Sequence, residues 1–293
     1  MKILVYGSLN IDVIFSVDHI AAPGETISSS SLTRSSGGKG ANQAAALAKA
    51  GMPVYMAGKI GEDGKFLLEL LRSYGVNTDN VVCYEGATGQ ALIQVDKSGQ
   101  NAIVLYGGGN SAVELGEIAI VAAQFSAGDI LVVQNEIAHT KEIMKSAKQR
   151  GMKVYLNPSP YNDTIEKLPL ELVDVFFVNE LEARALASLP PQTSPGMSLD
   201  ALVKRFPAAE IILTAGTDGA YYGAPAIRAR ATIVEVPVVD TTAAGDTFTG
   251  YYIASRVRNF PVQEALNLAC KAASITVSRP GAMQSIPFKD EVF

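Results

Sequence analysis

The stretch VVDTTAAGDTFTGYYIAS, residues 238–255, decides how the rest of the chain is interpreted. A β-branched run ends at Asp240, small residues follow, and the apolar run from Phe248 to Ile253 predicts a helix. A helix entrance without bulky side chains exposes backbone N–H groups and a positive dipole end, which favours an anionic ligand. A carboxylate at Asp246 would repel that ligand, so we expect it to have a chemical role of its own.

Composition limits the class of protein. The chain has 293 residues, of which 48% are hydrophobic, and a net charge of −5. That length suits one large α/β domain, and the acidic balance argues against a nucleic-acid partner. Cys83 and Cys270 are too few and too far apart for a disulfide framework or a zinc site. The first residues lack a signal-peptide pattern and no apolar run is long enough to cross a membrane, so we expect a cytoplasmic protein without a membrane partner.

Short apolar runs alternate with longer helical patterns along most of the chain. This alternation predicts βαβ units, and therefore a three-layer α/β/α fold around a mostly parallel sheet. The almost continuous apolar runs fit strands that are buried on both faces. Expected strands cover 2–7, 53–61, 129–134, 153–158, 173–179 and 210–216, and expected helices cover 40–51, 64–75, 113–125, 140–151 and 199–206.

Two segments interrupt the alternation. Residues 11–35 contain an alternating pattern and a Pro-Gly turn, and residues 88–106 predict a hairpin around Lys97-Ser98-Gly99-Gln100. Together they predict a small antiparallel sheet that projects from the main domain as a lid or a dimer surface. We therefore expect a single domain over 1–293, with these two segments as its lid.

A glycine-rich segment, SSGGKGANQAAALAKAG at 35–51, precedes an alanine-rich helix. Its glycines would let a ligand approach the backbone, and Lys39 and Asn42 would supply a cation and an amide at the helix entrance. A glycine-containing loop before a surface helix would explain the same pattern without a ligand.

Polar residues follow three of the expected strands. Asn10 and Asp12 share one face of an extended segment and could chelate vicinal hydroxyls, or form a polar turn that caps the first strand. Asn179 and Glu182 are one helical turn apart, which suits a pair near hydrated magnesium and equally suits a capping box. Glu136, just past a strand end, is either a ligand group or a cap.

Five motifs follow one another along the chain: N-x-D at 10–12, GGKGANQ at 37–43, N-x-x-E at 179–182, T-x-G-x-x-G at 214–219 and D-T-x-A-A-G-D at 240–246. In this order they resemble the ribokinase-like (PfkB) family of sugar kinases, and the match runs from Gly7 to Pro287. The stretches GSLNID, PGET, GGKGANQ and LNPSP are most similar to the ribokinase subfamily. The resemblance implies ATP-dependent phosphorylation of a sugar hydroxyl, with D-ribose to D-ribose 5-phosphate as the first expectation. Deoxyribose, a ketohexose or a nucleoside is the alternative substrate. A catalytically silent sugar-binding protein is a further alternative, which the intact Asp246, Gly245 and Lys39 disfavour.

The resemblance also implies roles for individual residues. Asp246 would be the catalytic base and would contact the sugar, beside an anion hole formed by Ala243, Ala244 and Gly245. The other sugar-binding residues would be Asn10, Asp12, Gly38, Lys39, Asn42 and Glu136. The nucleotide would contact Asn179, Thr214, Gly216, Thr217, Gly219, Gly245 and Cys270. Glu182 would act on hydrated Mg²⁺, and a K⁺ ion would be held at Asp240, Thr242, Thr276, Arg279, Gly281 and Ser285, at several of them by main-chain carbonyls.

The resemblance implies small-molecule partners, ATP and a sugar. The two lid segments predict a homodimer formed through the lid, because an isolated hairpin is marginally stable in water and needs a packing partner. Three places depart from the family pattern. Cys270 stands where the family usually has a polar His or Asn near the adenine, and Gln134-Asn135-Glu136 replaces a more apolar approach to the glutamate. The segment at 189–199 shows little resemblance to its counterparts.

Overall fold

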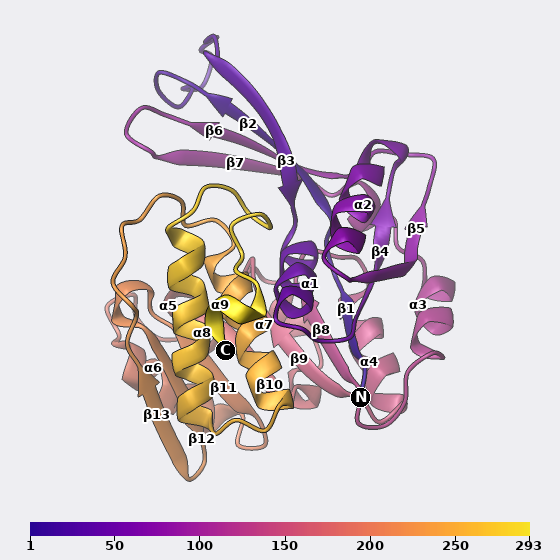
Figure 1. Cartoon of the computed structure of the whole chain (residues 1–293), viewed down its shortest axis with the longest axis vertical. Coiled ribbons are helices and arrows are strands. Elements are labelled where there is room, and N and C mark those ends of the chain that lie inside the picture. Colours follow the sequence, from indigo (N-terminus) through magenta and orange to yellow (C-terminus); the bar gives the residue numbers. More distant parts are fainter.

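Nine strands form the large sheet of the computed structural model, which describes all residues from Met1 to Phe293 (Figure 1). The order is β13-β12-β11-β10-β9-β8-β1-β4-β5; pairings from β11 to β5 are parallel, and β12 and β13 form an antiparallel hairpin at one edge. The strands are β1 (Ile3–Tyr6), β4 (Val54–Ile60), β5 (Asn77–Cys83), β8 (Ile130–Gln134), β9 (Lys153–Asn157), β10 (Val175–Asn179), β11 (Glu210–Thr214), β12 (Ala220–Ala224) and β13 (Ile227–Ala231).

All six strands expected from the sequence are present in this sheet, and the mostly parallel arrangement is confirmed. The sequence did not predict β5, β12 and β13. β5 and β13 are the two edge strands, where a strand is covered less completely and needs no continuous apolar run, and β12 lies next to β13. The polar sequence NTDNVVC of β5 is an example.

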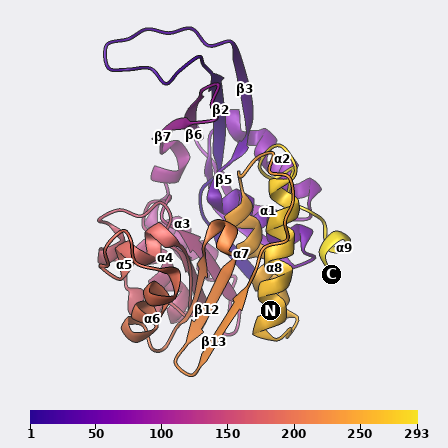
Figure 2. The ribbon, with the colours of Figure 1, turned by 90° about the vertical axis from the view of Figure 1, so that its left-hand side faces the viewer.

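Helices cover both faces of the large sheet and complete the three layers (Figure 2). α1, α2, α7 and α8 cover one face and α3 to α6 the other. None of the helices combines the length and the apolarity that crossing a membrane requires. The helices are α1 (Lys39–Lys49), α2 (Lys65–Ser73), α3 (Leu115–Ala122), α4 (Thr140–Gln149), α5 (Glu180–Leu186), α6 (Pro195–Arg205), α7 (Ala244–Val257), α8 (Val262–Val277) and α9 (Lys289–Val292), with short 3₁₀ turns η1 (Glu62–Gly64), η2 (Gly108–Ser111), η3 (Ile165–Lys167), η4 (Leu170–Leu172) and η5 (Gly216–Asp218).

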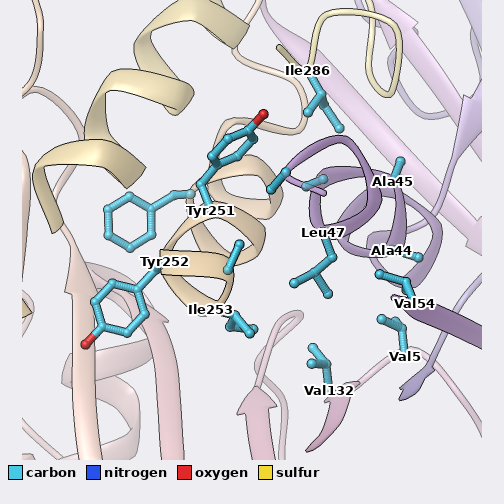
Figure 3. Close-up of a cluster of buried hydrophobic side chains, with 14 of the residues drawn as sticks. Val5, Ala44, Ala45, Leu47, Val54, Val132, Tyr251, Tyr252, Ile253 and Ile286 are labelled. Atoms are coloured by element: carbon cyan, nitrogen blue, oxygen red, sulfur yellow. The ribbon is translucent and has the colours of Figure 1, made fainter. Parts of the chain in front are cut away.

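The alanine-rich helix α1 is buried, so the interpretation of it as a surface helix is wrong. Its residues from Gly40 to Leu47 are all buried. Small side chains let α1 approach α7 closely, and Leu47 lies with Tyr251 and Ile253 above Val132 of the sheet (Figure 3). This contact matters for function because α1 and α7 both begin at the candidate active site.

A second sheet of four strands projects from one end of the molecule (Figure 1). Its order is β3-β2-β6-β7, and the two outer pairings are antiparallel as expected. The central pairing of β2 with β6 is parallel, because both strands run outward from the main body. Both segments expected to form the lid contribute two strands each. They are β2 (Asn10–Ser16), β3 (Ser31–Gly37), β6 (Gly89–Val95) and β7 (Asn101–Tyr106).

Candidate active site

Asp246 lies in the first turn of α7 and is only 8% exposed. The residue before the helix, Ala243, has a left-handed backbone (φ 60°), a conformation that costs an alanine about 1 kcal/mol. The Nδ2 atom of Asn42 donates to Oδ2 of Asp246 over 3.0 Å, and Nε2 of Gln43 donates to Oδ1 over 2.9 Å. Both oxygens of this carboxylate are therefore held by amides of α1.

A cavity of about 210 Å³ opens at the N-terminal end of α7. A Cβ atom at Gly245 would meet nothing within 4 Å, so this glycine leaves the space in front of the helix open. Lys39, the first residue of α1, lines the same cavity together with Ala243 and Ala244. The first N–H groups of α7, the helix dipole and an ammonium group therefore face one space, which suits a phosphoryl group.

The glycines of the GGKG segment are explained by packing of the chain against itself. Gly38 has a φ of +93°, and a Cβ atom there would lie 2.8 Å from the backbone N of Asn10. A Cβ atom at Gly40 would lie 2.6 Å from the backbone carbon of Gly7. These close approaches seat the start of α1 on the β1–β2 connection. Packing against this connection is enough to explain why glycines stand at 38 and 40, without a ligand that approaches the backbone.

Asn10 and Asp12 lie in β2, so the interpretation of them as a polar turn is wrong. Asn110 in η2 accepts the N–H of Leu9 over 3.0 Å, and its Nδ2 donates to Oδ1 of Asn10 over 2.7 Å. The amide of Asn10 therefore has its NH₂ group left to bind a ligand. Asn10 lines a cavity of about 360 Å³, together with Glu136.

Glu136, which follows β8, binds the entrance of α1. Its Oε2 atom accepts the Ser8 hydroxyl over 2.5 Å and the N–H of Lys39 over 3.3 Å, and the Ser8 Oγ accepts the N–H of Gly40 over 3.2 Å. Ser8 is fully buried. Glu136 thus acts as a cap for α1 and also reaches a cavity, so the sequence alternatives of cap and ligand group do not exclude each other.

The ammonium group of Lys39 lies among four carboxylates, which affect its pKa. Burial acts to lower the pKa of Lys39, but the charges of Asp246, Glu136, Glu182 and Asp12 act in the opposite direction and the net pKa is raised. Burial raises the pKa of Asp12 to about 7, with a further contribution from Glu136 and an opposing one from Lys39. At neutral pH Asp12 can therefore donate as well as accept a hydrogen bond.

Asn179 and Glu182 form a capping box at the start of α5, which confirms that interpretation. The N–H of Asn179 donates to Oε2 of Glu182, and the N–H of Glu182 donates to Oδ1 of Asn179, both over 2.9 Å. Both residues also line the 210 Å³ cavity opposite Gly245. The pKa of Glu182 is raised, and burial of its carboxyl group is the largest cause.

The residues around Glu182 fit a hydrated magnesium ion. No group of three or more His, Cys, Asp or Glu side chains could hold a metal ion by itself. Mg²⁺ commonly keeps several waters and binds one or two carboxylates together with substrate phosphates. Glu182, beside a phosphate-sized cavity, supplies the carboxylate of that arrangement.

A second cavity of about 300 Å³ adjoins the first, and the two share Thr214, Thr241, Ala244 and Gly245. Its walls include the side chains of Phe248 on α7 and Cys270 on α8, an apolar surface that suits a planar base. The structure brings all seven sequence-predicted nucleotide residues to this pair of cavities. They are Asn179 in the first cavity, Gly216, Thr217, Gly219 and Cys270 in the second, and Thr214 and Gly245 in both.

The residues expected to hold potassium lie in the loop before α7, in the last turn of α8 and in the loop after α8, and a hydrogen bond joins the two loops. Oδ1 of Asp240 accepts the N–H of Thr242 over 2.9 Å, and Oδ2 accepts the N–H of Gly281 over 3.0 Å. The side chain of Thr276 bonds within the helices, and the Arg279 guanidinium pairs with Glu291. Thr276 and Arg279 could therefore bind a cation only through their main-chain carbonyls. Ser285 likewise bonds within its own turn, to the carbonyl of Ala282.

Sequence reasoning gave no role to four residues that the structure places at the site. Ser8, Gln43, Asn110 and Gln134 are buried polar side chains that hold Glu136, Asp246, Asn10 and Gln43 respectively. The amide of Gln43 next to Asn42 was the one available signal. The others become visible only when distant segments are brought together.

A family model described as "pfkB family carbohydrate kinase" matches residues 1–289. The chain is 33% identical over 296 residues to the ribokinase of Haemophilus influenzae, covering 98% of this chain and 95% of that protein. It is 35% identical over 301 residues to the bifunctional ribokinase/ribose-5-phosphate isomerase A of Fructilactobacillus sanfranciscensis, where it spans 99% of this chain and 55% of the longer protein. The solved structure of the Arabidopsis thaliana ribokinase complexed with ribose and ATP matches with a TM-score of 0.87 and 30% identity, covering 99% of this chain and 97% of that one.

Proposed function

The chain belongs to the pfkB family of carbohydrate kinases, and we propose that it transfers the terminal phosphoryl group of ATP to the 5-hydroxyl of D-ribose. As a member of that family it is an ATP-dependent sugar kinase. The ribose assignment is supported by its similarity to ribokinases over nearly its whole length. We further propose that residues 1–293 act as one catalytic domain, with the four-stranded sheet as a lid over the sugar.

The position of Asp246 carries the proposal. Asp246 lines the cavity at the N-terminus of α7, and Asn42 and Gln43 of α1 hold both oxygens of its carboxylate. In the proposed reaction Asp246 accepts the proton of the sugar hydroxyl as that oxygen attacks the phosphorus atom. The N–H groups of Ala243, Ala244 and Gly245 stabilise the charge on the transferring group. Lys39 contributes a fixed positive charge beside it.

The nucleotide would occupy the two adjoining cavities. Its base would pack between Phe248 and Cys270, and its phosphates would extend past Thr214 toward Gly245. Hydrated Mg²⁺ near Glu182 would neutralise phosphate charge when bound. K⁺, held by carbonyls of the loops that contain Asp240 and Gly281, would order the start of α7.

The sugar would lie between β2 and α1. Asn10, Asp12, Lys39, Asn42 and Glu136 would bind its hydroxyls. Because Asn110 fixes the amide of Asn10, the NH₂ group of Asn10 faces the ligand as a donor. A 2-deoxysugar would leave that donor without a partner, which disfavours it against ribose.

Exposed apolar side chains on the lid support a homodimer formed through it. Leu32 on β3 and Ile103, Val104 and Leu105 on β7 are each at least half exposed. An isolated small sheet is marginally stable in water and gains from a packing partner. Light scattering that gives only monomer would contradict this part of the proposal.

ADP release measured with a panel of sugars and nucleosides tests the function. We expect ribose to give the highest kcat/KM, with deoxyribose far below it. If a ketohexose or a nucleoside ranks first, the ribose assignment is wrong and the kinase assignment survives.

A further inference from the structure

Two buried glutamines connect the large sheet to Asp246. Gln134 is the last residue of β8, and its Nε2 atom donates to Oε1 of Gln43 over 2.6 Å. Gln43 in turn donates from Nε2 to Oδ1 of Asp246 over 2.9 Å. Both glutamines are fully buried, so no water competes for these bonds.

Building on the proposed role of Asp246 as the base, we propose that Gln134 and Gln43 form a two-amide relay that fixes the orientation of the Asp246 carboxylate. Both would be positioning residues for phosphoryl transfer. Neither lines the cavity next to Asp246, so they act through the carboxylate and not on the substrate.

The direction of the relay follows from the chemistry of its end. An ionised carboxylate can only accept hydrogen bonds, so Gln43 must turn its NH₂ group toward Asp246. Its carbonyl oxygen then points away and needs a donor, which only the NH₂ group of Gln134 supplies. If the Gln134 amide were reversed, two carbonyl oxygens would face each other.

The structure makes room for Gln134 at a cost in stability. A Cβ atom at Gly7 would lie 2.1 Å from Oε1 of Gln134, so the glycine accommodates this amide. Oε1 of Gln134 is buried and has no hydrogen-bond partner. An unpaired buried carbonyl destabilises a protein, and an apolar side chain of similar size would avoid that cost. An amide at 134 is therefore better explained by what it donates to than by folding.

Gln134→Leu separates the relay from a purely structural role. We expect the melting temperature to stay close to that of wild type, because the unpaired oxygen of Gln134 is removed while the buried carbonyl of Gln43 loses its donor. Since Gln43 loses the donor that holds its amide, kcat should fall about 10-fold to 100-fold, the scale of a misplaced catalytic group. The KM for ribose should stay within about twofold, because Asn10 and Asp12 are untouched.

Gln134→Glu gives a signature that only the relay predicts. A neutral carboxylic acid at 134 still donates to Gln43, whereas an ionised one takes the NH₂ group of Gln43 and turns its oxygen toward Asp246. The kcat of this variant should be near wild type at about pH 6 and should fall relative to wild type toward about pH 9. The leucine variant should be impaired by a similar factor throughout.

The other charged groups around the relay stay constant in this comparison. Lys39 on α1 and Glu182 on α5 share the cavity with Asp246 and are present in every variant. The amide of Gln134 lies against Gly7, which follows β1, and bonds to Gln43 of α1; neither residue titrates. A matched control is Gln124→Leu. Gln124 forms an amide pair with Asn80 on the surface, and its loss should leave kcat and the pH profile unchanged.

Wild-type kcat in Gln134→Leu, or a Gln134→Glu profile parallel to that of wild type, overturns the relay. A strongly lowered melting temperature in Gln134→Leu overturns it as well, because the role would then be structural. If wild type phosphorylates no sugar, the proposed function fails, and the relay is still tested without substrate. The unfolding free energies of Gln43→Leu, Asp246→Asn and the double variant give the coupling of the two residues, and zero coupling refutes the relay.

Discussion

Gly250 on α7 and Ala46 on α1 touch so closely that a Cβ atom on Gly250 would lie 2.5 Å from the Cβ atom of Ala46. Gly250 is one helical turn after Asp246, and Ala46 is one turn after Asn42. The contact between these two small residues therefore sets the distance over which the amides of α1 reach the carboxylate of α7.

Gly250→Ala should consequently impair both folding and catalysis. The added methyl group overpacks the α1–α7 contact and should cost about 1–3 kcal/mol of unfolding free energy. It should also lower kcat, since Asp246 moves away from Asn42 and Gln43. Gly196→Ala on α6 is the matched control, because a Cβ atom there meets nothing within 4 Å. That control should be stabilised by up to about 1 kcal/mol. Denaturant unfolding measures the free energy of unfolding, and steady-state kinetics measures kcat. A Gly250→Ala variant with the stability and kcat of wild type would contradict the prediction.

Asp12 should make stability depend on pH. Its pKa is raised from an ordinary 3.8 to about 7, so between these values the folded state binds more protons than the unfolded state. Stability from this residue is present at low pH and is lost as pH rises through about 7. Asp12→Asn removes the effect. It should unfold like wild type at acid pH and be more stable above neutrality, by an amount on the order of a few kcal/mol.

The same variant should bind ribose more weakly, because Asp12 would position hydroxyls. Stability and KM are therefore expected to change in opposite directions. A variant that melts like wild type at every pH would contradict the raised pKa of Asp12.

Glu182→Gln should separate capping from magnesium binding. The amide oxygen of glutamine can still accept the N–H of Asn179, so α5 and the melting temperature should change little. The loss of the charge should raise the Mg²⁺ concentration needed for half-maximal activity, about tenfold if one charge–metal contact of about 1.4 kcal/mol is lost. Titration of activity with Mg²⁺ tests this. The control is Glu180→Gln, which removes a partly exposed acid from the same turn and should leave the requirement unchanged.

Activity should rise with potassium and respond weakly to lithium. This prediction rests on the hydrogen bond between Asp240 and Gly281, which joins the two loops and places main-chain carbonyls beside the start of α7. K⁺ would stabilise that arrangement, whereas smaller Li⁺ fits it poorly. Equal rates in the two salts would remove the potassium site from the proposal.

The sequence predicted the layers of the fold and many of the residues that line the two adjoining cavities, for a clear physical reason. Central strands and helix entrances have local patterns, so β1, β8 and the start of α7 could be recognised residue by residue. The residues that hold the site in place have no local pattern. Asn110 and Gln134 lie 100 and 91 residues from their partners Asn10 and Gln43. The reason for the glycines at 38 and 40 was also hidden, because it lies in their contact with Gly7 to Asn10.

Asp246→Asn is the decisive test of the mechanism. The new side chain has an NH₂ group where Asn42 and Gln43 now donate to an oxygen, so one of these two amides must turn over. Asn42 can do so, because its Oδ1 atom is buried without a partner and would then accept. The variant should therefore fold and bind ribose almost normally.

If Asp246 is the base, kcat of the Asp246→Asn variant should fall about 10²- to 10⁴-fold. If it is only an acid at a helix N-terminus, the variant should lose about 0.3–1 kcal/mol of stability and turn over normally. Steady-state kinetics on the folded variant distinguishes the two, and a near-wild-type kcat would refute the proposed base.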